Sequence, residues 1–273
     1  MEREIITSRQ NPLVKFVCGL AEKKLRSKEG LFRFDGVKLL SEALSSDIAI
    51  KYIIYREPAS SRIDELICQA RQLGRIDDGG TVAVSASVFE KISDERSPEG
   101  VITVAFMPDI HGRYSDATQV RDEKILIVES MRDPGNLGTV IRSCYALGID
   151  RLIMTDDCAD IYNQKTVRAA MGAIFRQKTL SVPNSELSSF IRELLKNGRN
   201  VYATALLEHS RDIGEIKLRV GDCFVIGNEG HGLTEETVNA CTAPVIIPMR
   251  EDTESLNAAA AAAICIWETV RAK

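Results

Sequence analysis

The stretch ILIVESMRDPGNLGTVIRSCYALGID, residues 125–150, decides the fold of this 273-residue chain. It begins with a buried apolar strand, predicted over 124–129, and continues through a polar turn into a helix predicted over 136–148. The same succession of strand, polar loop and helix recurs in FVIGNEGHGLTEE, 224–236, and in VIIPMREDTESLNAAAAAAICIWE, 245–268. In an α/β sheet such loops lie beyond the carboxyl ends of the strands, where ligands bind. We therefore expect the three blocks to converge on one site.

Strands and helices alternate regularly in the last 150 residues. We predict strands over 124–129, 151–155, 177–182, 200–206, 222–227 and 244–248, and helices over 136–148, 163–174, 185–197, 234–241 and 255–271. This alternation is typical of an α/β domain whose mostly parallel sheet is covered by helices on both faces. The run of six alanines at 258–263 favours a helix with a thin surface, which suits close packing against another helix.

The N-terminal residues form a second module with its own α/β pattern. The pattern predicts helices over 11–28, 37–46 and 60–74, strands over 31–36 and 49–57, and strand and turn material over 80–94 and 99–108. Residues 108–122, PDIHGRYSDATQVRD, lack a periodic apolar pattern and are rich in turn formers and charge, so we interpret them as a linker. The predicted domains are therefore 1–107 and 123–273.

The charge of the chain is unevenly distributed. The net charge is −4, yet residues 1–40 contain nine Lys or Arg side chains against five acidic ones, a local excess of four positive charges. Such a basic surface can attract a polyanion even on an acidic protein, because distant charges are screened beyond about 10 Å. The alternative for this segment is a solvated helix face.

Composition and apolar patterns argue against several classes of protein. A hydrophobic fraction of 44% with 27% charged residues is ordinary for a globular protein. The N-terminus MEREIITSRQ lacks the apolar stretch of a secretory signal, and the longest apolar run, 258–267, is too short to span a bilayer, so we expect a cytoplasmic protein with no membrane partner. The cysteines form no CxxC pair, which predicts reduced, mostly buried thiols rather than a metal site or disulfides. They are Cys18, Cys68, Cys144, Cys158, Cys223, Cys241 and Cys265.

The polar loops carry the candidate chemistry. The turn that ends at Asn136 leads into a helix whose free N–H groups favour an anion, and Arg142 lies nearly two turns further along. Three glycines within 227–232 let the backbone approach a ligand closely and hold Glu229 at a strand end. The chain has neither GxGxxG after a first strand nor GxxxxGK[ST], which disfavours a nicotinamide dehydrogenase or a nucleotide hydrolase.

Single residues in these loops also have ordinary structural interpretations. Arg142 alone reads as a surface arginine, and Ser255 as the N-cap of the alanine-rich helix. Asn257 has both a donor and an acceptor with which to position a substrate or cofactor group, or it is solvated in the first turn. His231 is left out of the catalytic set, because a lone histidine in a glycine loop more often caps or packs.

The ordered motifs resemble those of a known family. N-L-G-x-x-x-R at 136–142, G-N-E-G-x-G-L at 227–233, and I-P-M followed by S-L-N within 247–257 are similar to the SpoU, or TrmH-like, RNA ribose 2′-O-methyltransferases of the SPOUT superfamily. This resemblance covers about residues 122–273 and is specific, because three motifs occur in order. SRQNPLVK and FRFDGVKLLSEAL, within 8–44, resemble less closely the small substrate-binding domain of many members, an α/β module of the ribosomal protein L30e type.

The resemblance implies an enzyme that uses S-adenosylmethionine, works as a homodimer through its methyltransferase domain, needs no metal and has a deep trefoil knot near its carboxyl end. The residues implied for catalysis are Asn136, Arg142, Glu229, Ser255 and Asn257. The residues implied for the cofactor are Thr204, Ala205, Leu206, Gly227, Asn228, Glu229, Gly230, Ile247, Pro248, Met249 and Leu256. The residues implied for RNA are Arg9, Lys15, Arg33 and Arg168.

The implied reaction transfers the sulfonium methyl group to a ribose 2′-hydroxyl by in-line displacement. The protein must mainly align oxygen, carbon and sulfur, and such positioning can account for about 7 to 11 kcal/mol of the barrier. The family's proposal makes Arg142 the base that takes the hydroxyl proton. Deprotonating a guanidinium is costly, so an arginine that clamps the adjacent phosphate and polarises the 2′-oxygen is physically easier.

Three alternatives remain open at the level of sequence. The first is an RNA-binding protein with a decayed methyltransferase domain, against which the intact motif residues count. The second is a methyltransferase that modifies a base, which the S-L-N block disfavours. The third is a transfer RNA target in place of ribosomal RNA, which the additional N-terminal domain disfavours by analogy alone.

Overall fold

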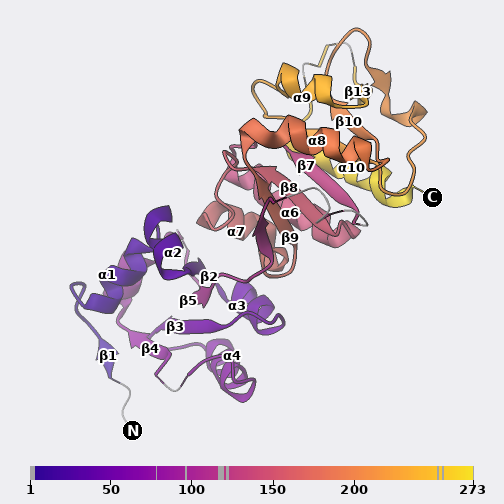
Figure 1. Cartoon of the computed structure of the whole chain (residues 1–273). Helices are drawn as coiled ribbons and strands as arrows, with labels where there is room; N and C mark the ends of the chain where they lie inside the picture. The colour runs from indigo at the N-terminus through magenta and orange to yellow at the C-terminus, as the bar shows by residue number, and fades with distance from the viewer. Residues whose placement is uncertain are drawn as a thin grey trace. The chain divides into compact units, whose positions relative to one another are not determined.

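The computed structural model divides the chain into two compact units. It describes residues 4–77, 79–95, 97–115, 120, 123–250, 252–253 and 255–272. Unit 1 comprises Met1–Pro108 and Tyr162–Phe175, and unit 2 comprises Asp109–Ile161 and Arg176–Lys273 (Figure 1). The boundary after Pro108 falls at the start of the expected linker. The segment Tyr162–Phe175, which lies in the second predicted domain, belongs to unit 1.

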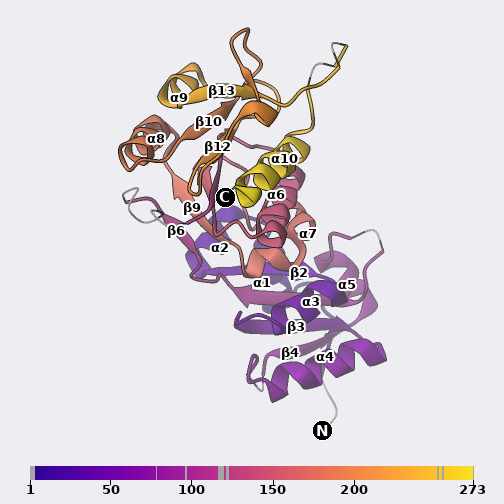
Figure 2. The ribbon, with the colours of Figure 1, turned by 90° about the vertical axis from the view of Figure 1, so that its right-hand side faces the viewer.

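Unit 1 is built on a mixed sheet of five strands in the order β1, β4, β3, β5, β2. The strands are β1 (Ile5–Ile6), β2 (Leu31–Asp35), β3 (Ile50–Arg56), β4 (Thr81–Val84) and β5 (Val101–Phe106). The helices are α1 (Pro12–Gly19), α2 (Lys23–Glu29), α3 (Val37–Leu44), α4 (Ser61–Gln72) and α5 (Ala86–Ile92). Residues of α3 and α4 pack on one face of the sheet and residues of α1 and α5 on the other, so the predicted α/β pattern is present (Figure 2).

Two local expectations for unit 1 are wrong. The helix predicted over 11–28 is interrupted between α1 and α2. The buried Arg26 side chain stabilises the turn after α1, because it donates to the carbonyl oxygens of Leu20 (2.8 Å) and Ala21 (2.6 Å). The turn material expected in 80–94 contains α5. Its signal is Ser85, which caps the helix by accepting from the Val88 N–H.

The segment Tyr162–Phe175 joins unit 1 through aromatic packing. It forms α7 (Gln164–Ala170) and the 3₁₀ helix η2 (Met171–Phe175), where one helix over 163–174 was expected. The helix is interrupted at Met171, whose φ is 52°. The Tyr162 ring lies 4.7 Å from that of Phe32, and the Phe175 ring 5.2 Å from that of Phe34. These contacts with β2 explain why the segment packs with the N-terminal residues.

Unit 1 holds a carboxyl group whose ionisation opposes folding. Burial raises the pKa of Asp35 from 3.8 to about 6, although a hydrogen bond from Ser93 and the charge of Arg33 lower it. The folded state therefore binds the proton more tightly than the unfolded state, so stability falls as pH rises from about 4 to 6 and the cost is complete above that range.

Asp35→Asn cannot ionise, so it is expected to gain stability relative to the wild type as pH rises. The gain between about pH 4 and 7.5 is on the order of 3 kcal/mol, because each unit of pKa is worth about 1.4 kcal/mol. Urea unfolding at both pH values, followed by hydrogen exchange in peptides of unit 1, measures it. A difference in unfolding free energy that does not change with pH would contradict the prediction.

Unit 2 contains a sheet of eight strands in which every pair of neighbours in the described residues is parallel. The order is β11, β13, β10, β12, β7, β8, β9, β6. The bounds are β6 (His111–Arg113), β7 (Ile125–Val128), β8 (Arg151–Thr155), β9 (Lys178–Val182), β10 (Val201–Thr204), β11 (Arg211–Asp212), β12 (Cys223–Ile226) and β13 (Ala243–Ile246). The predicted parallel sheet is confirmed. The chain first moves from β7 toward β9 and then builds β10, β12 and β13 on the other side of β7, so the direction reverses between β7 and β12.

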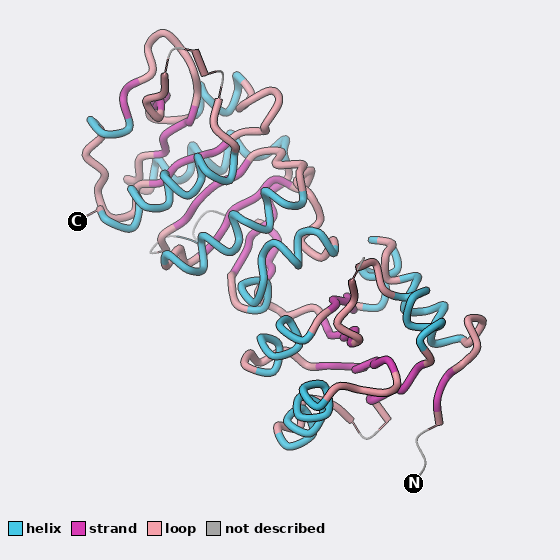
Figure 3. The backbone as a smooth tube through the Cα atoms, turned by 180° about the vertical axis from the view of Figure 1, so that it is seen from behind, coloured by secondary structure: helices cyan, strands magenta, loops and turns pink. Residues whose placement is uncertain are grey.

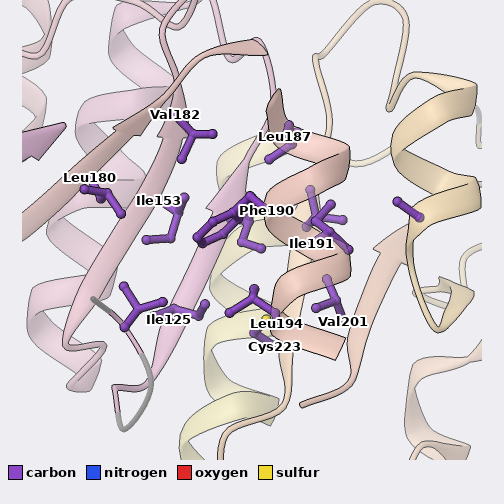
Figure 4. Close-up of a cluster of buried hydrophobic side chains, with 14 of the residues drawn as sticks. Ile125, Ile153, Leu180, Val182, Leu187, Phe190, Ile191, Leu194, Val201 and Cys223 are labelled. Carbon is purple, nitrogen blue, oxygen red and sulfur yellow. The ribbon is translucent and has the colours of Figure 1, made fainter. Parts of the chain in front are cut away.

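Helices cover both faces of this sheet. They are α6 (Pro134–Leu147), α8 (Leu187–Lys196), α9 (Glu235–Ala240) and α10 (Ala258–Arg271), with short 3₁₀ turns η3 (Asn184–Glu186) and η4 (Ile213–Glu215). On one face, Phe190 and Leu194 of α8 pack among Ile125, Ile153 and other strand residues (Figure 4). On the other face α10 packs along α6, as the tube in Figure 3 shows, and its alanines 258, 259 and 262 are buried there.

The expected linker 108–122 contributes the edge strand β6, which pairs in parallel with β9. The side chain of His111 is 2.9 Å from the Thr179 hydroxyl, Nδ1 to Oγ1. The pattern missed this strand because an edge strand is held by backbone pairing, and the residues His111, Gly112 and Arg113 carry no apolar period. Residues 116–119, 121 and 122 of the expected linker lie outside the described residues.

The cysteines are free thiols, as expected. Cys144, Cys158, Cys223 and Cys265 are buried, whereas Cys68 is exposed. Burial raises the pKa of Cys223 to about 12 and that of Cys158 to about 11, so these thiols stay protonated and unreactive at neutral pH. None of the described helices combines the length and the apolar character that a bilayer crossing requires.

Candidate active site

A cavity of about 850 Å³ lies at the carboxyl ends of β10, β12 and β13. This volume is typical of sites for small molecules and cofactors. Of the residues expected to hold a cofactor, only Pro248 does not line it, and Pro248 is exposed. Those that line it are Thr204, Ala205, Leu206, Gly227, Asn228, Glu229, Gly230, Ile247, Met249 and Leu256.

The cavity wall combines open backbone with exposed leucines. Leu206 is 57% exposed, Leu207 42% and Leu256 37%, and all three line the cavity. Exposed leucines gathered around one cavity mark a surface that a partly apolar ligand would cover. The lining also includes two histidines, His209 and His231, that the sequence analysis did not assign to the site.

The glycine loop after β12 is closed by its own backbone. Asn228 and Gly232 exchange two hydrogen bonds of 3.0 Å each, and the Asn228 Oδ1 accepts from the N–H groups of Gly230 (2.8 Å) and His231 (3.3 Å). A Cβ atom at Gly227 would lie closer than 3.0 Å to backbone atoms of Gly232 and Leu233, so only glycine fits there. These contacts hold the loop in one defined shape.

Three polar side chains from the three blocks meet beside this loop. The Asn136 Nδ2 donates to the Glu229 Oε1 at 2.9 Å, and the Asn257 Nδ2 donates to the Asn136 Oδ1 at 3.0 Å. Asn136 lies in the first turn of α6, Glu229 in the glycine loop and Asn257 directly before α10. The prediction that the three loops converge is confirmed, and we call these residues the polar junction.

Helix caps fix the polar junction in place. Asp133 caps α6 by accepting from the Asn136 N–H at 2.8 Å. Asn257 caps α10 through its Oδ1, which accepts from the N–H groups of Ala259 and Ala260, and this leaves its Nδ2 for Asn136. The assignment of the cap to Ser255 is therefore wrong, because α10 begins at Ala258 and an asparagine caps a helix as well as a serine does. Ser255 lines the cavity instead.

Arg142 is not part of the polar junction. It lies on α6, its side chain is exposed, and it makes no hydrogen bond or ion pair with another residue of the described ranges. Its position six residues after Asn136 turns it about 120° away around the helix axis. A substrate group at the helix surface would find this guanidinium with all its donors available.

The residues that support these loops were not among those predicted from the sequence patterns. Glu129 is 1% exposed and accepts from the Thr234 N–H, the Thr234 hydroxyl and the Thr237 hydroxyl, so it ties β7 to the start of α9. Ser130 and Asp157 lie in the loops after β7 and β8, and Ser130 bonds to the glycine loop. The available signal was a polar residue directly after a buried strand, in VES and in TDD.

The residues expected to bind RNA fall in unit 1, and one of them is misassigned. Lys15 on α1 and Arg168 on α7 are exposed, and Arg9 is exposed with its Nε donating to the Ser87 carbonyl. Arg33 is only 3% exposed, because its Nη1 donates to the Ile92 carbonyl and its Nη2 pairs with Asp94 at 2.6 Å. Arg33 thus stabilises unit 1 and presents no charge to a ligand.

Two family models match the chain. The model of the SpoU rRNA Methylase family matches residues 123–267. The model of the MRM3-like substrate binding domain matches residues 11–103. Together they span both units.

Full-length relatives and solved structures are also similar. The 23S rRNA (guanosine(2553)-2′-O)-methyltransferase RlmP of Bacillus subtilis is 31% identical, over 96% of this chain and 97% of that protein. The 23S rRNA (uridine(2479)-2′-O)-methyltransferase of Streptomyces viridochromogenes is 28% identical, over 97% and 91%. The structure of an AdoMet-bound rRNA methyltransferase from Sinorhizobium meliloti matches with a TM-score of 0.82 at 28% identity, over 99% of this chain and 98% of that one.

Proposed function

Because the chain belongs to the SpoU rRNA methylase family, we propose that it transfers a methyl group from S-adenosylmethionine to a ribose 2′-hydroxyl of ribosomal RNA. The observation that carries the proposal is the polar junction of Asn136, Glu229 and Asn257 beside a cavity of about 850 Å³. A decayed methyltransferase domain would have no reason to retain this connected set of side chains.

The cavity fits S-adenosylmethionine in size and chemistry. Leu206, Leu207 and Leu256 offer apolar contact to the flat adenine ring, and the glycine loop brings backbone amides and carbonyls within reach of the polar parts of the cofactor. The bound cofactor supplies a methyl group that is already activated by the sulfonium charge. We assign its binding to the backbone around Thr204 to Leu206, Gly227 to Gly230, Ile247 to Met249, and Leu256.

The polar junction would position the ribose. Asn136 already uses its amide for Glu229 and Asn257, so its orientation is fixed before substrate binds. Preorganisation of this kind lowers the cost of aligning the reacting atoms. We assign Asn136, Glu229, Ser255 and Asn257 to substrate and cofactor alignment, and Arg142 to the phosphate next to the target ribose.

The RNA target is inferred from the relatives. Both curated relatives above are named as 23S rRNA methyltransferases, and residues 11–103 match a substrate-binding domain. We propose that unit 1, an α/β module of the ribosomal protein L30e type, binds this RNA, with Arg9, Lys15 and Arg168 on its surface. A ribosomal RNA target would place the enzyme in the cytoplasm, where ribosomes assemble.

We further propose a knotted carboxyl end and a homodimer formed through unit 2. The chain leaves β13 near one edge of the sheet and returns as α10 to pack against α6 and β12 at its centre, and this return supports the knot. Tyr145 of α6 is 48% exposed and Trp267 of α10 is 55% exposed. Large exposed aromatic side chains on two packed helices support a protein partner there, and the partner we infer is a second copy of the chain.

Incubation with radiolabelled S-adenosylmethionine and purified ribosomal RNA is expected to label 2′-O-methyl nucleosides after complete digestion. Transfer RNA in a parallel reaction should stay unlabelled. Asn136→Ala, which breaks both hydrogen bonds of the polar junction, serves as the inactive control. Label in a base would assign the other reaction, label in transfer RNA alone would assign the other substrate, and no label with any RNA would favour the decayed domain.

A further inference from the structure

Ser130, directly after β7 and Glu129, has an unusual backbone. Its φ is 52°, and it is one of two non-glycine residues in the described ranges with a positive φ. The left-handed region is unfavourable for residues with a Cβ atom, and a serine stays there only when its surroundings hold it. Ser130 does not line the cofactor cavity, so contact with the cofactor is not the reason for this conformation.

Groups at the ends of the next two strands hold Ser130. Its N–H donates to the Thr155 Oγ1 (2.8 Å), and its hydroxyl donates to the Asp157 Oδ2 (2.6 Å) and accepts from the Asn184 Nδ2 (3.0 Å). The Thr155 hydroxyl in turn donates to the other oxygen of Asp157 at 2.7 Å. Asp157 thus accepts from both Ser130 and Thr155, and it ties the ends of β7 and β8 together.

Asp157 remains ionised in this environment. Partial burial would raise the pKa of its carboxyl group, but hydrogen bonds from Ser130, Thr155, Asn184 and Arg132 outweigh burial and hold the pKa below its usual value. A charged acceptor makes stronger hydrogen bonds than a neutral one, which suits a residue that holds a neighbour in a strained conformation.

In its left-handed conformation, Ser130 forms a hydrogen bond to the glycine loop. The Ser130 carbonyl oxygen accepts from the Asn228 Nδ2 at 2.7 Å, and the other atom of that amide, Oδ1, accepts from Gly230 and His231. Glu229, between Asn228 and Gly230, bonds to Asn136. A continuous path of hydrogen bonds therefore runs from Asp157 through Ser130 and Asn228 to the loop that lines the cavity.

We infer that Asp157 is a positioning residue that fixes the cofactor loop by holding Ser130 in the left-handed conformation. The inference rests on the proposed function for its ligand, although the shape of the loop can be measured without any ligand. Neither Asp157 nor Ser130 lines the cavity.

Substitutions at Ser130 separate this role from simple hydrogen bonding. Ser130→Ala loses the hydroxyl and keeps the cost of a positive φ, so S-adenosylmethionine is expected to bind about tenfold more weakly, the factor that corresponds to about 1.4 kcal/mol. Ser130→Gly also loses the hydroxyl, but glycine adopts a positive φ freely, so the affinity should stay within about twofold of the wild type. Asp157→Ala should resemble Ser130→Ala, and adding Ser130→Gly to Asp157→Ala should restore most of the affinity.

Titration calorimetry gives the affinities, and hydrogen exchange of residues 227–233 without ligand reports the loop. Exchange should increase in Ser130→Ala and Asp157→Ala but not in Ser130→Gly. Asp156→Asn is the matched control, because this neighbouring carboxylate accepts from the Asn184 N–H and makes no hydrogen bond with Ser130 among the described residues. Two results would overturn the inference. One is an equal loss of S-adenosylmethionine affinity in Ser130→Gly and Ser130→Ala, and the other is unchanged hydrogen exchange of residues 227–233 in Asp157→Ala. A wild type that binds no S-adenosylmethionine would instead overturn the proposed function.

Discussion

Gly227→Ala is expected to weaken S-adenosylmethionine binding by up to about a hundredfold and to lower methyl transfer at limiting cofactor. The added Cβ would lie 2.6 Å from the Gly232 carbonyl oxygen and closer still to other backbone atoms of Gly232 and Leu233, none of which can rotate away as a side chain could. Overpacking of this kind costs about 1 to 3 kcal/mol, and here it opens the loop that lines the cavity. Calorimetric titration with S-adenosylmethionine measures the loss.

Gly230→Ala is the matched control for the fold of the same loop. Its Cβ would meet only the Asn228 Oδ1, at 3.5 Å, which is an ordinary contact. The variant should keep the thermal stability of the wild type and the hydrogen exchange of residues 227–233. If Gly227→Ala binds S-adenosylmethionine as the wild type does, the glycine loop does not form the cofactor site.

Arg142→Ala is expected to lower kcat at least about a hundredfold and to leave the affinity for S-adenosylmethionine within about twofold. Arg142 does not line the cavity and bonds to no other residue among those described, so its removal should change neither the pocket nor the stability. We expect kcat to fall because the variant lacks the positive charge that Arg142 would place beside the reacting ribose. Single-turnover methyl transfer to ribosomal RNA, compared with cofactor titration, separates the two effects.

Arg142→Lys distinguishes the two roles considered for this residue. If Arg142 is a phosphate clamp, lysine at this position keeps the charge but loses the paired N–H donors of the guanidinium. The kcat of Arg142→Lys should then lie between those of Arg142→Ala and the wild type, with the pH dependence of the wild type. As a base, lysine would release its proton more readily, and kcat should rise toward alkaline pH. Arg192→Ala, at an exposed arginine of α8, is the control and should keep full activity. Full activity in Arg142→Ala would remove Arg142 from the mechanism.

Much of unit 2 could be predicted from sequence, because its elements repeat one pattern. The central strands β7 (ILIV) and β12 (CFVI) are apolar throughout, and a polar loop follows each of them, so periodicity and composition locate both. The errors lie where local signals are weak or compete. The strand β6 has no apolar period, α1 and α2 are separated by the side chain of Arg26, and the cap of α10 is Asn257 although Ser255 fits the same rule.

The sequence by itself indicated candidate residues for a site but not how they are connected. The motifs identified Asn136, Glu229 and Asn257, whose separation of up to 121 positions along the chain gives no distance. Only the reversal of strand order between β7 and β12 brings the loops after these strands together. Likewise, the positive charge of Arg33 is evident from the sequence. Only the tertiary structure shows that its guanidinium donates to the Ile92 carbonyl and pairs with Asp94.

The sequence alone therefore determined the parallel α/β sheet, the motif residues and the free thiols, because each depends on composition or on neighbours along the chain. Tertiary structure alone decided that Ser130 adopts a positive φ. It also decided that the Ser130 hydroxyl donates to Asp157 and that Asn228 of the glycine loop donates to the Ser130 carbonyl oxygen. No local rule predicts a left-handed serine, since its conformation is unfavourable unless hydrogen bonds from distant strand ends offset the cost. The physical reason is that secondary structure follows from local preference, whereas the shape of a site follows from contacts between residues far apart in the chain.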